Sequence, residues 1–167
     1  MPPSSRPDRE HFTAKGCVVL SSLDRTTLTQ VAYDYYLWTG EGLTVTSGTR
    51  TPRSQAAAMY YKLTHGGIPS HFYKNHQAYG EILAAYNDAR KARANEQATV
   101  DAMTRVIDRQ VSKGIYISLH LRGEAVDVRS RGMSSNDTKV LDEAVRRVVG
   151  DPKQHLLQET DHFHLQF

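Results

Sequence analysis

The sequence predicts an α+β domain in which a small, mainly antiparallel sheet is flanked by helices. Apolar and polar residues alternate along residues 43–47 and again along residues 162–167, which is typical of strands that bury one face. Other segments repeat apolar residues every three or four positions, which is typical of amphipathic helices. With 167 residues, the chain is most simply a single domain.

Helices are expected wherever this longer period is sustained. In residues 26–38 the apolar side chains fall near one face. Pro52 suits the first turn of the next helix, because proline there loses no N–H group that the helix needs. The stretch 90–97 is polar all round, and it is either a helical bridge or a break between two helices. The expected helices cover residues 26–38, 52–63, 79–86, 100–111 and 134–148.

Strands are expected at residues 43–47, 115–117, 125–128, 154–158 and 162–167. The last two are predicted to be joined by a turn at residues 159–161. On the final strand, Phe163, Leu165 and Phe167 share one face, which we expect to be the core face. The histidines of this strand then lie on the opposite face.

Composition narrows the class of protein. The net charge of +3 and the pI near 9.0 fit a polyanionic partner such as a cell-wall polymer, but no clustered basic face indicates a nucleic-acid binder. The single cysteine, Cys17, excludes an internal disulfide. The sequence contains no run of about 18 apolar residues, so no membrane-spanning helix is predicted. Residues 1–14 lack the apolar stretch of a signal peptide and are expected to form a short disordered lead.

Histidine and carboxylate side chains gather in two segments of the C-terminal half. His120 and Asp127 are seven residues apart with a glycine between them, which suits ligands that converge from a turn and the strand after it. His162 and His164 are two residues apart, so on a strand they share a face. Three protein ligands and an open position for water are typical of a catalytic zinc site, whereas a structural site usually has four ligands, often cysteines. The pattern therefore predicts one catalytic Zn²⁺ per chain.

Three segments together resemble a known family. They are Ser47-Gly-Thr-Arg50-Thr-Pro52-Arg-Ser-Gln55, Ser118-x-His120-x-x-Gly123-x-Ala125-x-Asp127 and Asp161-His162-Phe163-His164. In this order they are similar to the signature of the zinc D-Ala-D-Ala carboxypeptidases and dipeptidases. Phage L-alanyl-D-glutamate endopeptidases, penicillin-insensitive murein endopeptidases and the Hedgehog signalling domain share that family's fold. The resemblance spans residues 47–167 and implies a Hedgehog/DD-peptidase-like fold.

The resemblance also implies a role for each candidate residue. His120, Asp127 and His164 would be the zinc ligands. Arg50 would lie beside the carbonyl group of the bond that is cut. Ser118, which precedes a ligand by two residues, and Gln55 are expected to contact the substrate together with Arg50.

The sequence leaves three candidates for the general base. Some family members carry a glutamate three residues before the last ligand, where this chain has Asp161. Others carry a histidine two residues before it, where this chain has His162. The shorter carboxylate favours His162 as the base, with Asp161 supporting it. Glu159 becomes the base if His162, rather than His164, binds the metal.

The function that the resemblance implies is hydrolysis of peptide bonds in peptidoglycan stem peptides. The motifs leave open a D-Ala-D-Ala carboxypeptidase, an L-Ala-D-Glu endopeptidase and a cross-bridge endopeptidase. The alternative is a Hedgehog-like binding module that contains zinc but hydrolyses little or nothing. The peptidase domain would cover residues 15–167, with residues 68–114 as a helical insertion that forms a wall or lid of the cleft.

The expected site of action follows from that substrate. Made in the cytoplasm without a signal peptide, the protein would reach the bacterial cell wall or periplasm by release or by injection. A phage lysin and an antibacterial effector both fit these conditions. An immunity or inhibitor protein is a further class of partner that the sequence leaves open.

Overall fold

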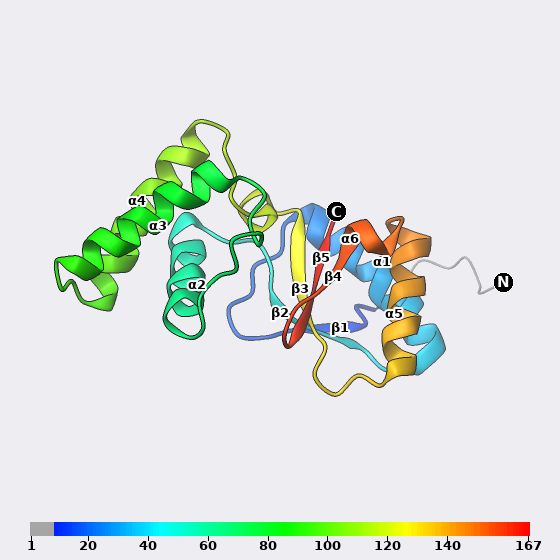
Figure 1. Cartoon of the computed structure of the whole chain (residues 1–167). Coiled ribbons are helices and arrows are strands. Elements are labelled where there is room, and N and C mark those ends of the chain that lie inside the picture. Colours follow the sequence, from blue (N-terminus) through cyan, green and yellow to red (C-terminus); the bar gives the residue numbers. More distant parts are fainter. Residues whose placement is uncertain (1–8) are drawn as a thin grey trace. The chain divides into compact units, whose positions relative to one another are not determined.

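The computed structural model describes residues 9–167, which divide into two compact units (Figure 1). The first, called the sheet unit below, combines the residues up to Thr49 with Gly123–Phe167. The second, called the helical unit, is Arg50–Arg122. The chain therefore leaves the sheet unit once, forms the helical unit and then returns.

The sheet unit contains a mixed sheet of five strands. Their order across the sheet is β1 (Phe12–Ala14), β2 (Leu43–Ser47), β3 (Ala125–Arg129), β5 (His162–Gln166) and β4 (Leu156–Gln158). The α+β class is confirmed. The sheet is mixed rather than mainly antiparallel, because β1 runs parallel to β2 while the other neighbouring pairs are antiparallel. The parallel pair arises because α1 (Ser22–Thr39) connects the two strands, and a helical crossover returns the chain in the same direction.

The core of the sheet unit is formed by one face of the sheet together with α1 and α5 (Ser135–Val148) (Figure 1). Helix α1 begins before the predicted residue 26, because Ser21 and Asp24 form a capping box that satisfies the first N–H groups. Ser134 and Asp137 start α5 in the same way. The fully buried apolar side chains include Leu28, Val31, Leu43, Val45, Val126, Val128, Leu141, Ala144, Val145 and Leu165.

Part of the expected N-terminal lead forms a strand. Residues 1–8 lie outside the described residues, whereas Phe12–Ala14 is β1. The Phe12 side chain is buried in the core of the sheet unit, and Phe12 pairs with Leu43 of β2. Phe12 is a single buried apolar residue in a mostly polar stretch, and one residue is too few to show the two-residue period of a strand.

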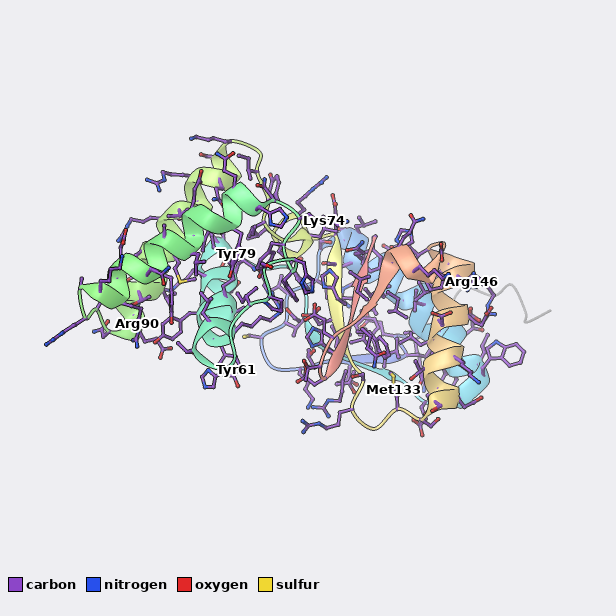
Figure 2. The ribbon with its side chains drawn as sticks, in the orientation of Figure 1. Tyr61, Lys74, Tyr79, Arg90, Met133 and Arg146 are labelled. Carbon is purple, nitrogen blue, oxygen red and sulfur yellow. The ribbon has the colours of Figure 1, made fainter. Side chains whose placement is uncertain are left out.

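The helical unit contains α2 (Pro52–Thr64), α3 (His76–Lys91), α4 (Glu96–Ser112) and the 3₁₀ helix η1 (Leu119–Arg122). These elements enclose a hydrophobic core of their own. Tyr79 of α3, labelled in Figure 2, is buried in this core. The polar stretch 90–97 is a break: α3 ends at Lys91, and the Asn95 side chain accepts the N–H of Ala98 to start α4.

Two predicted strands differ from the structure. Residues 115–117 form no strand, because Ile117 is buried in the core of the helical unit and the Ile115 N–H group bonds to the Gln110 carbonyl. The first part of the expected strand 154–158 belongs to α6 (Pro152–His155). Asp151 caps that short helix, and Pro152 occupies its first turn, where proline favours helix.

Gly123 allows the chain to enter β3. Its backbone has φ +66°, a conformation that strongly favours glycine, and its carbonyl accepts a 2.6 Å hydrogen bond from the Ser21 hydroxyl. A Cβ atom at this position would lie 2.7 Å from the Cβ of Ser21. A side chain at position 123 would therefore clash with the side chain of Ser21.

We predict that Gly123→Ala lowers the free energy of unfolding by about 2 kcal/mol or more, since the left-handed backbone alone costs roughly 1–2 kcal/mol. Urea denaturation followed by circular dichroism measures the change. Gly132→Ala is the matched control, because Gly132 has φ +93° but no atom within 4 Å of its added Cβ. If both variants lose the same stability, the close approach of Ser21 is not a constraint.

Candidate metal centre

Strands β3 and β5 present the candidate ligands of the sheet unit on one face. Their antiparallel register places Asp127 directly opposite His164. Phe163 and Leu165, which alternate with the histidines, are buried in the core. His162 and His164 therefore share the other face, as predicted. The His164 Nδ1 atom lies 3.1 Å from Asp127 Oδ1, and Asp127 is 5% exposed.

His162 is held by carboxylates on both ring nitrogens. Its Nε2 atom lies 3.1 Å from Glu159 Oε2, and its Nδ1 atom lies 2.8 Å from Asp161 Oδ1. The same Nε2 atom is 3.6 Å from Asp127 Oδ1, which directs it toward the candidate ligands. The turn at residues 159–161 brings both carboxylates to the ring, and the Glu159 N–H group donates to the His162 carbonyl within it.

These contacts stabilise the charged imidazole. The hydrogen bond to Glu159 is the main cause that raises the pKa of His162 to about 9, and Asp161 and Asp127 add to it against the opposing effect of burial. The hydrogen bond to His162 in turn lowers the pKa of Asp161.

In the helical unit, the candidate residue Arg50 is supported by a buried amide. Arg50 Nη1 donates to Gln55 Oε1 at 3.2 Å, and Gln55 Nε2 donates to the Tyr73 hydroxyl at 3.4 Å. Gln55 is 1% exposed, so its observed partners are protein groups. Its amide orients the Arg50 guanidinium, and Tyr73, which no sequence motif singles out, orients the amide.

His120 lies in η1 and is tied to Arg50 through the backbone. The Arg50 N–H group donates to the His120 carbonyl at 2.9 Å. The Ser118 hydroxyl accepts the His120 N–H group at 3.4 Å, so Ser118 supports the conformation of this turn. The His120 side chain is 2% exposed.

His120, Asp127 and His164 form a group that could hold a metal ion. One ligand atom from each residue lies within 4.8 Å of the others. This is the group that the sequence predicted as ligands, and it leaves out His162. The sequence had suggested Asp161 as a support for His162, but it did not foresee that Glu159 contacts the same ring as well.

The donor set fits zinc. Two imidazoles and one carboxylate are borderline donors that Zn²⁺ accepts, and three protein ligands leave a fourth position for water. Ligand atoms about 2.0 Å from a tetrahedral ion lie roughly 3.3 Å from one another. The 3.1 Å separation of Asp127 Oδ1 and His164 Nδ1 is close to that value.

Comparisons of the chain with protein-family models, with curated proteins and with solved structures each found no match. Among the described residues, no helix has both the length and the apolar character needed to span a bilayer. Any functional assignment therefore depends on the geometry of the site and on the motifs of the sequence.

We predict that His120→Ala and His164→Ala each reduce bound zinc from about one equivalent per chain toward zero, because each removes one of three protein donors. Metal analysis after dialysis against zinc buffer measures the content, and circular dichroism checks folding. His155→Ala is the matched control, because the Nδ1 atom of His155 contacts the Gln166 carbonyl and His155 lies outside the ligand group. Full zinc in either ligand variant would remove that histidine from the site.

Proposed function

We propose that the protein is a zinc peptidase that hydrolyses peptide bonds in peptidoglycan stem peptides, with a fold of the Hedgehog/DD-peptidase type. The observation that carries the proposal is the group His120, Asp127 and His164, whose ligand atoms lie together beside a histidine engaged by two carboxylates. A single metal-binding group could be structural. A neighbouring proton-transfer group is what a hydrolytic site needs in addition.

A zinc ion held by these residues would lower the pKa of water toward about 7 and polarise a carbonyl group. The protein's own residues supply the remaining functions. His162 is the proposed proton-transfer group, and its Nε2 atom lies 3.1 Å from Glu159 Oε2 and 3.6 Å from Asp127 Oδ1. Glu159 shares that proton, so the proposed acid–base group is the Glu159–His162 pair, with Asp161 fixing the opposite side of the ring.

Arg50 is the proposed group for negative charge on the substrate. Its guanidinium carries a permanent charge and is oriented by the buried Gln55 amide. A donor that is held in place before the reaction stabilises developing charge without reorganisation. Gln55 is therefore proposed as a positioning residue, in place of the direct substrate contact that the motif suggested.

The proposal is tested by digestion of purified peptidoglycan. We expect new amino and carboxyl termini in the wild-type digest, loss of that activity with a chelator, and its recovery when zinc is added back. Mass spectrometry of the released muropeptides identifies the bond that is cut. Stoichiometric zinc without any new termini would contradict the peptidase proposal and favour the binding module instead.

We predict that His162→Ala keeps bound zinc but lowers kcat by about 100-fold or more, because general acid–base groups typically contribute that much. Muropeptide release and metal analysis are measured on the same preparation. Asp161→Asn should have a smaller effect, since the Asp161 side chain is 64% exposed and its charge is screened by solvent. If His162→Ala empties the site while His164→Ala does not, His162 is the ligand and Glu159 is the base.

A further inference from the structure

One row of side chains crosses the sheet from the candidate ligands to the outer strand. The register pairs Asp127 of β3 with His164 of β5, and His164 with Leu157 of β4. Residues that pair directly across antiparallel strands point to the same face, with Cβ atoms about 5 Å apart. Asp127, His164 and Leu157 therefore stand side by side on the site face.

Leu157 is the apolar member of this row. Its side chain is 43% exposed, while its neighbour Leu156 packs against the core of the sheet unit. The other β5 residues of the site face, His162 and Gln166, are polar. An isolated exposed leucine is common on protein surfaces. This one differs in its position, because it stands directly opposite a candidate metal ligand, His164.

The outer edge of β4 is open to an extended chain. β4 is the last strand in the sheet order, so among the described residues no strand pairs with its second edge. Because Glu159 N–H bonds to the His162 carbonyl, Glu159 and His162 are a hydrogen-bonded pair. Alternation along the ladder then turns the N–H and C=O groups of Gln158 away from β5, toward that open edge. Peptides commonly bind to such an edge in extended form.

We propose that Leu157 determines substrate specificity by packing against an apolar side chain of an extended peptide substrate. This inference rests on the proposed peptidase function and narrows its substrate class. The substrate residue beside Leu157 would be uncharged and apolar, such as alanine. A carboxylate-bearing residue would be rejected there, because the leucine methyl groups cannot compensate its loss of water. Stem-peptide bonds flanked by alanine are therefore favoured over bonds flanked by glutamate.

The test uses the zinc-loaded full chain and synthetic stem peptides in which one position at a time is alanine, glycine or glutamate. For the wild type, we expect one position of the peptide to be selective. Replacing alanine by glycine at that position should lower kcat/KM about 10-fold, a typical value for one methyl group in an apolar pocket. Glutamate at the same position should lower kcat/KM further. In Leu157→Ser the alanine-to-glycine ratio at that position should approach one. Zinc content should stay near the wild-type value, because Leu157 lies outside the candidate ligand group.

Two further variants separate specificity from folding. Leu157→Met keeps an apolar side chain and should retain the preference for alanine. Leu37→Ser makes the same exchange as Leu157→Ser at a leucine of α1 that is 38% exposed, and it should leave all ratios unchanged. If the wild type cleaves the peptides and Leu157→Ser has the same alanine-to-glycine ratio, the role of Leu157 is overturned but the peptidase function is not. Absence of cleavage by the zinc-loaded wild type overturns the peptidase function and this inference together.

Discussion

Asp127 and His164 face each other because apolar residues on the reverse side of the same two strands hold the β3–β5 register. Val126, Val128 and Leu165 are fully buried there. A slip of one residue in β5 would turn Leu165 toward solvent and His164 into the core. Burial of each apolar side chain contributes roughly 1.5–3 kcal/mol, so the slipped pairing is strongly disfavoured. Hydrophobic packing, before any metal binds, thus brings the carboxylate and the imidazole together.

Local patterns predicted the elements whose burial follows a regular period. The final strand has a two-residue period, and its inward-facing Phe163 and Leu165 are in the core as expected. Local patterns failed at β1, which is a strand that was not predicted, and at residues 115–117, which were predicted as a strand but form none. Residues Phe12–Ala14 form a strand only because β2 offers an edge far along the chain. The β-branched Ile115 and Ile117 favour a strand locally, but the helical core takes up Ile117 instead.

The sequence predicted His120, Asp127 and His164 as ligands through the resemblance of three segments to a family signature, and the same three residues form the group that could hold a metal ion. The surroundings of each ligand were less accessible. Glu159 reaches His162 through the geometry of a hairpin turn, which residue spacing alone does not determine. Gln55 belongs to a motif that suggested substrate contact, yet it is buried against Arg50 and a tyrosine hydroxyl. Such partners depend on three-dimensional packing and leave no short pattern in the chain.

The hydrogen bond from the Arg50 backbone to His120 joins the beginning and the end of the helical unit. A segment whose ends already meet can grow or shrink with only a small entropic penalty, since doubling a loop's length costs about 0.6 kcal/mol. A shorter or longer segment could therefore replace α3 and α4 during evolution while the hydrogen bond between Arg50 and His120 is kept. The β3–β5 ladder holds Asp127 and His164, whereas α3 and α4 contribute no residue to the candidate ligand group.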